Sequence, residues 1–433
     1  MTQGPDASIL VTDWNDTGEC HNYEVTDGVT GRIYRVVPET VRDKGIRPAN
    51  LSSIKLVDLL ACGDAWLEEQ ARNALRSRFD HGALGAEKAA VRDSLEKKAT
   101  SRDAEGRTRL TAIWALLVTG GVPAGVLDNA VNDPDEAVRS WGARLGLPSR
   151  VARWVARVKE GEPSAKTRLA IISASGQLPA PDRMDLLEPL ARGMADAADP
   201  MIPLLLWYQL EPVLADSAKA RDKLLSGPCL QPLARYLARR MAGSMDGDAW
   251  LARACAGETG AHPSHGASLL AGWADGLAGR AQPPVPSGWD KTYAYLAKKS
   301  DPEIRLLSMR LAQVFASPDV AGALKSLAAD ATLPLETRAG ALDAWATRPR
   351  GDLRFLLEYL RSEELAEPAL RALATGADPA LAADLAAAFA KVGPRARNGI
   401  LAVLAGRKAW AVVLVGAMEK GTIDHREVPA HLA

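Results

Sequence analysis

The sequence predicts a mainly α-helical protein built from repeated helical pairs, with a short β-hairpin in front of them. From residue 51 onward, Ala- and Leu-rich segments alternate with Gly, Pro or Asp-Pro, which is the pattern of short helices and turns. An Asp-Pro and Arg pattern then recurs along these segments. Before residue 38 the chain is instead rich in β-branched, aromatic and turn-forming residues. These three observations set the fold class.

The hairpin comes first in the chain. Residues 9–14 and 32–37 are short and rich in β-branched or aromatic side chains, so we expect them to form two strands. Residues 15–31 between them are full of Asn, Asp, Thr and Gly, which favour turns and predict a long connecting loop. The β-hairpin is therefore assigned to residues 1–37, and residues 38–50, with two prolines, are interpreted as a linker.

A degenerate repeat runs through the helical region. The segment DPDEAVRSWGARLG is echoed by DPEIRLLSMRLA, in which the matching residues are Asp133, Pro134, Val138, Arg139, Gly142 and Leu145 in the first and Asp301, Pro302, Ile304, Arg305, Ser308 and Leu311 in the second. We expect an arginine at the start of a helix, three residues before a small or apolar residue, also at Arg72, Arg109, Arg168, Arg338, Arg371 and Arg397. Where no repeat is skipped, successive members lie 26 to 37 residues apart, the span of one helical pair.

The repeated positions have a simple physical reading. Pro fits the first turn of a helix and Asp can cap it, so Asp-Pro ends one helix and begins the next. The small residue lets neighbouring helices approach closely. This pattern resembles the HEAT family of α-solenoids, in which each helical pair buries its apolar face on the next. Independent amphipathic helices in a bundle are the alternative.

The Pro-rich segment LAGRAQPPVPSGWD interrupts the array. We take residues 278–290 as a break between two solenoid segments, residues 51–277 and residues 291–433.

Composition and charge exclude several classes of protein. The 433 residues contain 53 Lys and Arg against 53 Asp and Glu, with no long block of either sign, which argues against nucleic acid as the main partner. The four cysteines are far apart and form no CxxC, so their spacing indicates neither a zinc site nor a disulfide framework. No apolar run approaches the roughly 18 residues of a membrane span, and the first residues lack the features of a signal peptide.

Few residues suggest chemistry. Acidic residues and a histidine crowd the predicted hairpin loop and could line a calcium or cofactor site, although a solvated turn explains them as well: Asp13, Asp16, Glu19, His21 and Asp27. Cys20 beside His21 lacks the second cysteine that a covalently bound haem needs. His262 and His265 would share one helix face and could grip a metal, but Pro263 and flanking glycines favour a loop.

No catalytic motif is present: the sequence has no GxSxG, no HExxH, no phosphate loop and no dinucleotide fingerprint. The eleven tryptophans are spread along the helical segments among apolar residues, which favours core packing for residues such as Trp66, Trp114, Trp141, Trp207 and Trp345.

A more specific resemblance covers nearly the whole chain. Seven stretches carry it, in this order: TDWNDTGECHNYEVTDGVTGRIYRV, WLEEQARNALRSR, LTAIWALLVTGG, DPDEAVRSWGARL, IPLLLWYQLEPVL, LARYLARRMA and LLAGWADGLAGR. They resemble the C-terminal half of the membrane-bound dehydrogenases typical of planctomycetes. That family joins a β-propeller, similar to soluble quinone-dependent sugar dehydrogenases, to HEAT-like repeats and usually a c-type cytochrome domain. IPLLLWYQLEP and LARRM are the most distinctive part.

The resemblance implies that residues 13–36 match the last propeller blade. The chain would then begin inside this blade and end before the haem domain, so quinone-type cofactor and haem c are implied only for the full-length family. We therefore expect a non-catalytic scaffold or docking arm between propeller and cytochrome modules, without a cofactor of its own. A periplasmic or membrane-associated location is likewise an implication of the family.

Two other functions stay open. One is a stand-alone HEAT-repeat module that binds a protein in its groove. The other is a metal-binding or enzymatic role for the loop at residues 13–27.

Overall fold

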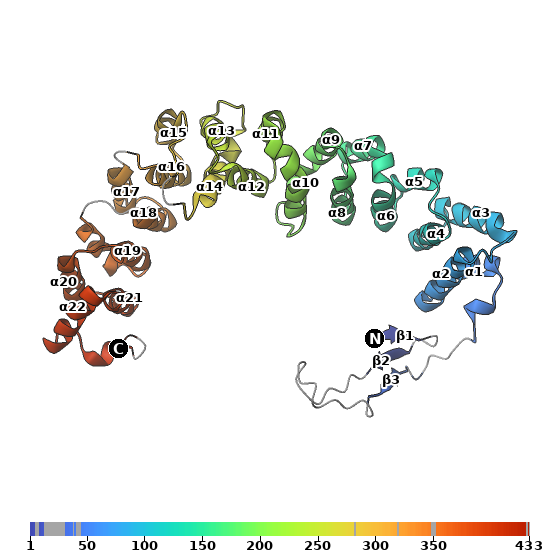
Figure 1. Ribbon diagram of the computed structural model, residues 1–433, viewed down its shortest axis with the longest axis horizontal. Helices are drawn as coiled ribbons and strands as arrows, with labels where there is room; N and C mark the ends of the chain where they lie inside the picture. The colour runs from blue at the N-terminus through green and yellow to red at the C-terminus, as the bar shows by residue number, and fades with distance from the viewer. Residues whose placement is uncertain are drawn as a thin grey trace. The chain divides into compact units, whose positions relative to one another are not determined.

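The computed structural model describes residues 1–4, 8–12, 31–37, 39, 45–280, 283–317, 320–347, 352–429 and 432. These residues contain a small sheet and 22 α-helices, which confirms the predicted mainly α-helical solenoid of helical pairs (Figure 1). The chain divides into two compact units, Met1–Leu190 and Ala191–Ala433. In the described residues, none of the helices combines the length and hydropathy needed to span a bilayer.

The N-terminal sheet has one strand more than predicted. β2 (Ile9–Thr12) pairs antiparallel with β3 (Ile33–Val36), with Ile9 opposite Val36, as the hairpin prediction requires. β1 (Thr2–Gln3) adds a third strand beside β2, so the order is β1-β2-β3. Residues 13–30, which include all of the predicted connecting loop except its last residue, lie outside the described residues.

Unit 1 continues with nine helices in its described residues: α1 (Ser53–Leu59), α2 (Ala65–Asp80), α3 (Glu87–Thr100), α4 (Gly106–Val118), α5 (Ala124–Ala130), α6 (Glu136–Gly146), α7 (Val151–Glu160), α8 (Ala165–Ala174) and α9 (Ala180–Ala191), of which the last residue of α9 crosses into unit 2. α2, α4, α6 and α8 pack side by side in chain order, and α3 and α5 cover α4 and α6. Their shared core is aliphatic, with Leu75, Val91 and Leu116 fully buried.

Unit 2 has thirteen helices among its described residues: α10 (Ile202–Asp216), α11 (Ala218–Leu225), α12 (Gln231–Met241), α13 (Met245–Cys255), α14 (Gly266–Leu277), α15 (Trp289–Leu296), α16 (Pro302–Val314), α17 (Val320–Ala329), α18 (Leu335–Thr347), α19 (Ala366–Leu373), α20 (Pro379–Ala388), α21 (Pro394–Ala405) and α22 (Lys408–Glu419). α10, α12, α14, α16 and α18 form one layer in chain order, and α13 packs against α15 in the other (Figure 1).

The predicted break at residues 278–290 does not coincide with the division between the units, because it lies inside unit 2. Trp273 of α14 and Trp289 of α15 stand on its two sides with ring centroids 5.5 Å apart, and Phe315 lies 4.9 Å from Trp289. All three rings are buried. A shared aromatic core therefore joins the helices before and after the prolines.

Most of the repeated arginines occupy one position, the fourth residue of their helix. This group consists of Arg109 in α4, Arg139 in α6, Arg168 in α8, Arg305 in α16, Arg338 in α18 and Arg397 in α21, and it gains Arg183 in α9 and Arg221 in α11, which were not predicted. Arg72 and Arg371 do not belong to it, because Arg72 lies in the middle of α2 and Arg371 in the last turn of α19. The prediction that these two begin helices is wrong.

Most of the arginines at this position share a task. Helical side chains lean toward the N-terminus of their helix, so an arginine in the first turn can reach the chain that precedes it. Arg139 donates to the carbonyls of Asp133 and Pro134 at 2.7 and 3.0 Å, and Arg221 donates to Leu214 and Ala215 at 2.7 and 3.0 Å. Similar bonds run from Arg109 to Ala104, Arg168 to Glu162, Arg338 to Ala328 and Arg397 to Val392. These arginines satisfy carbonyls that the preceding segment leaves unpaired.

The role of Asp-Pro differs between the two segments that carry the repeated pattern. Asp301 caps α16 as predicted, since its carboxylate accepts from the backbone N–H groups of Glu303 and Ile304. Asp133 is not a cap, because Asp135 takes that role at the start of α6. Asp133 instead accepts two bonds from Arg109 at 2.7 and 2.8 Å and one from the backbone N–H of Asp135.

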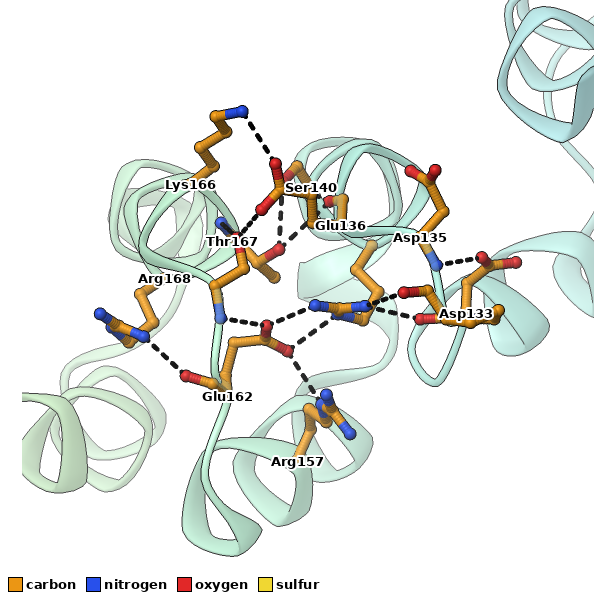
Figure 2. A network of polar contacts seen from close by, with 12 residues as sticks. Asp133, Asp135, Glu136, Ser140, Arg157, Glu162, Lys166, Thr167 and Arg168 are labelled. Carbon is orange, nitrogen blue, oxygen red and sulfur yellow. Dashed lines mark hydrogen bonds and ion pairs between the residues drawn. The ribbon is translucent and has the colours of Figure 1, made fainter. Parts of the chain in front are cut away.

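A second carboxylate repeats this arrangement one helical pair later (Figure 2). Glu162, whose side chain is fully buried, accepts from Arg139 at 2.8 and 3.0 Å and from Arg157 at 2.9 Å. The backbone N–H of Ser164 adds a bond of 2.9 Å. Burial alone would raise the pKa of the Glu162 carboxyl, but the donors Arg139, Ser164 and Arg157 together outweigh it and lower that pKa.

Candidate functional site

The acidic loop residues proposed from sequence as a calcium or cofactor site lie outside the described residues: Asp13, Asp16, Glu19, His21 and Asp27. Their metal or cofactor role stays a prediction.

The histidine pair lies in unit 2, on a short 3₁₀ turn (Pro263–His265) where a loop was expected. His265 is fully buried, and its Nε2 lies 2.9 Å from the carbonyl oxygen of Gly227. His262 contacts Ser264 instead, with Nδ1 2.9 Å from the Ser264 hydroxyl. The centroids of the two imidazole rings are 6.1 Å apart, and the ring planes are inclined at 66° to each other, so the rings are not parallel.

Burial shifts the pKa values of His265 and Cys229. It lowers the pKa of His265, which favours the neutral ring, and raises the pKa of the Cys229 thiol to about 11. The Cys229 sulfur lies 3.8 Å from His265 Nε2. Across the described residues, no three His, Cys, Asp or Glu side chains gather closely enough to hold a metal ion. The contact between Cys229 and His265 connects the segment before α12 to the start of α14.

A cleft of about 630 Å³ opens in unit 2 where α10, α12 and α14 lie side by side. The α10 side is built from residues spaced to share one helix face: Leu204, Trp207, Tyr208 and Glu211. Trp207 is half-buried and Tyr208 is 56% exposed. The Trp207 and Tyr236 rings are 5.8 Å apart and inclined at 49°, so the aromatic surface continues from α10 to α12.

Glycines and alanines bring α14 against α12. A side chain at Gly272 would overlap the carbonyl oxygen of Arg235, and one at Gly276 would lie 2.5 Å from the Ala242 side chain. Both glycines are in α14, one helical turn apart. The close approach that they allow places Gly276 in the wall of the cleft beside Tyr236.

Three arginines and one glutamate supply the charge of the cleft: Arg239, Arg240, Arg280 and Glu211. Arg240 is neutralised by Glu211, with Nε 2.7 Å from Oε1. Arg239 and Arg280 are exposed, and neither forms an ion pair with another described residue. The cleft therefore carries an excess of positive charge beside its aromatic rings.

A small network of hydrogen bonds holds Arg280 in place. Its Nη1 donates to the carbonyl of Gly243 at 2.9 Å. The buried carboxylate of Asp248 accepts from the N–H of Gly243 at 2.9 Å and from Trp273 Nε1 at 2.8 Å. Gly243 has φ of +83°, and a side chain there would overlap the Arg280 guanidinium. Burial raises the pKa of Asp248, although the Gly243 and Trp273 donors and Arg280 oppose that shift.

Sequence reasoning singled out the three segments that form this cleft but missed that they meet. IPLLLWYQLEPVL is α10, LARYLARRMA contains most of α12, and LLAGWADGLAGR runs through α14 to Arg280. Trp207 was assigned to the core, yet it lines the cleft. Of the other tryptophans named, Trp345 is buried as predicted, whereas Trp66, Trp114 and Trp141 are only partly buried. The spacing of Leu204, Trp207, Tyr208 and Glu211 is the signal that could have revealed the face.

No protein-family model matches the sequence, and no curated protein matches it. Among solved structures, the chain is similar to a crystal structure of Kap121p bound to Pho4p, with a TM-score of 0.48 and 13% identity over 85% of this chain and 47% of that one. A crystal structure of Kap121p alone gives a TM-score of 0.48 and 14% identity, covering 85% and 46%. The chain thus spans about half the length of these proteins. None of these comparisons supports the resemblance to the planctomycete-type dehydrogenases.

Proposed function

We propose that this chain is a helical-repeat scaffold that binds a protein partner in the cleft of α10, α12 and α14. The observation that carries the proposal is the combination, in one cleft, of the exposed Tyr208 and the half-buried Trp207 and Tyr236 with the exposed Arg239 and Arg280. Aromatic residues and arginine supply most of the binding energy at protein interfaces, where the rings bury large areas at little cost in conformational entropy.

The surrounding structure supports a docking role. Most of the cleft wall comes from α10, α12 and α14, of which α12 and α14 pack tightly through Gly272 and Gly276, whereas Gly243, Ser244 and Arg280 lie on the adjoining turns. A preformed surface loses little conformational freedom when a partner binds, which favours affinity.

Site-specific photo-cross-linking tests the proposal. A p-benzoyl-phenylalanine placed at Tyr208 in the full chain, in the cells from which the sequence comes, should cross-link to a discrete protein. The same reagent at Tyr295, an exposed tyrosine of α15 outside the cleft lining, is the matched control. The cross-linked protein is then purified and titrated against the wild-type chain and the Trp207→Ala variant.

Binding that weakens at least about tenfold in Trp207→Ala, equivalent to about 1.4 kcal/mol, would support the proposal. Cross-links only from the Tyr295 position, or equal affinity for the variant, would contradict it.

A more specific form of the proposal follows from the sequence resemblance alone. In it, the scaffold is a docking arm that links the propeller and cytochrome modules of a membrane-bound, quinone-dependent-type dehydrogenase. The stretches that carry the resemblance most distinctly, IPLLLWYQLEP and LARRM, lie in α10 and α12. If the protein cross-linked at Tyr208 carries a β-propeller or a c-type cytochrome module, this form gains support; a partner with neither module would contradict it and leave the general scaffold role intact.

A further inference from the structure

We infer that the partner segment bound by this cleft is acidic, with Asp or Glu side chains next to apolar or aromatic ones. The inference rests on the proposed function and adds the chemistry of the partner. It follows from the charge of the cleft, from the state of each arginine and from the apolar surface beside them.

The two unpaired guanidinium groups determine the sign of the partner's charge. Arg239 and Arg280 both line the cleft and are exposed, and among the described residues neither forms a direct ion pair, although the buried Asp248 interacts electrostatically with Arg280. A guanidinium binds a carboxylate with two parallel hydrogen bonds, whereas a lysine or arginine of a partner would be repelled. Arg280 is also held in place by the carbonyl of Gly243, so less of its freedom is lost on binding.

The aromatic surface of the cleft determines that the partner segment also carries apolar side chains. Tyr208 is 56% exposed, and Trp207, Tyr236 and Leu204 are half-buried around it. Covering such a surface with an apolar side chain releases water and contributes about 25 cal/mol per Å² of apolar area. A partner segment that places apolar side chains on α10 and carboxylates on Arg239 and Arg280 would match both the aromatic surface and the positive charge of the cleft.

Nucleic acid fits the cleft less well. A polyanion gains from a continuous positive surface, but Glu211 lies in the cleft and already neutralises Arg240. The whole chain has no net charge, with 53 basic and 53 acidic residues.

Fluorescence anisotropy with defined peptides tests the inference on the full chain. The probe is a labelled peptide of about twelve residues in which Glu and Asp alternate with Leu and Phe, and the control peptide carries Lys at every acidic position. The variant is Arg239→Gln combined with Arg280→Gln. Arg253→Gln is its control, because Arg253 is exposed on α13, does not line the cleft and forms no ion pair with another described residue.

The acidic peptide should bind, its affinity should fall with added salt, and the double variant should lose at least about tenfold, or about 1.4 kcal/mol. Arg253→Gln should change the affinity by less than about twofold, and circular dichroism should show that all variants keep their helices. Equal or tighter binding of the lysine peptide, no binding of the acidic peptide, or no effect of the double variant would overturn the inference.

Tighter binding of a single-stranded oligonucleotide than of the acidic peptide would also overturn it. A protein that cross-links at Tyr208 but is not displaced by the acidic peptide would refute the inference while leaving the proposed function standing. Absence of any cleft-dependent protein partner would instead refute the proposed function.

Discussion

The buried carboxylates of unit 1 show how single residues determine the packing between helical pairs. Asp133 precedes α6 and Glu162 precedes α8, and each accepts hydrogen bonds from the arginine at the fourth position of the helix two before, Arg109 of α4 or Arg139 of α6. Both ion pairs are almost inaccessible to solvent. A buried charge must be fully paired to be tolerated, so each pair fixes the distance between successive helical pairs.

Removing one partner should therefore be costly. Arg139→Ala leaves Glu162 buried with fewer donors, and we expect a loss of about 3 kcal/mol in the free energy of unfolding, measured by urea titration. Lys166→Ala is the control, because Lys166 forms an exposed ion pair with Glu136 at the edge of the same network (Figure 2). It should leave the urea midpoint nearly unchanged. Equal losses in both variants would contradict the assigned role of burial.

The lowered pKa of Glu162 predicts a dependence of stability on pH. Because the folded state holds this carboxyl ionised more strongly than the unfolded state does, Glu162 stabilises the protein above its ordinary pKa of about 4.3. This contribution declines as the pH falls below that value and is lost once the pH drops below the lower pKa of the folded state. Glu162→Gln should be less stable than wild type at pH 7, and the gap should narrow on acidification. A gap that is constant between pH 7 and pH 3 would disprove the linkage.

At the scale of elements, the packing of α12 against α14 depends on small residues. Gly272 lies so close to α12 that an added methyl group would overlap the Arg235 carbonyl and come within 2.9 Å of the Ala238 side chain. Since a backbone carbonyl cannot rotate away, the helices would have to separate.

Gly272→Ala should thus destabilise the protein by about 1–3 kcal/mol and weaken partner binding, because the cleft is built on the same two helices. Gly416→Ala provides a matched control in α22, where nothing lies within 4 Å of the added methyl group and alanine is the better helix former. It should stabilise by roughly 0.5–1 kcal/mol. Thermal melts followed by circular dichroism compare the two; stabilisation by Gly272→Ala would refute the packing argument.

Much of each element was predictable from local sequence, and the cleft was not. Helix starts follow from a capping side chain in the preceding residue, as at Asp301, and the recurring arginine follows from its spacing. The prediction that Asp133 caps α6 was wrong, because Asp133 instead accepts hydrogen bonds from Arg109, 24 residues earlier in the chain. The cleft needs α10, α12 and α14 to meet; the approach of α14 to α12 depends on Gly272 and Gly276, and no local pattern encodes which helix they contact.

At the scale of the whole molecule, the chain is an array in which stability accumulates between neighbouring helical pairs. In each unit the even-numbered helices contact the next even-numbered helix, from α2 to α8 and from α10 to α18. The Pro-rich segment between α14 and α15 did not end the array, because Trp273 and Trp289 share a core across it. Prolines are therefore a poor guide to boundaries where large buried rings lie on both sides.

The N-terminal sheet stands apart from this array. Its three strands contain two to four residues each, and Ile9, Ile33 and Tyr34 are 48%, 72% and 55% exposed. Such side chains add little burial to the helical core, which begins with Leu56 and Val57 of α1. The predicted linker at residues 38–50 also ends differently from expectation, since Pro48–Asn50 forms a 3₁₀ turn that packs on α2.

Deleting residues 1–45 should consequently leave the helical array intact. Arg78 of α2 keeps its hydrogen bonds to the carbonyls of Ala49 and Leu51 in this truncation, so α1 and α2 retain their N-terminal support. We expect the melting temperature to change by at most about 2 °C, which corresponds to roughly 1 kcal/mol or less in a protein of this size. A longer deletion of residues 1–52 removes both acceptors of Arg78 and should lower the melting temperature further. If the shorter deletion alone unfolds the helices, the sheet is an integral cap of the solenoid, and its exposed strands would then have to act through contacts other than those of Ile9, Ile33 and Tyr34.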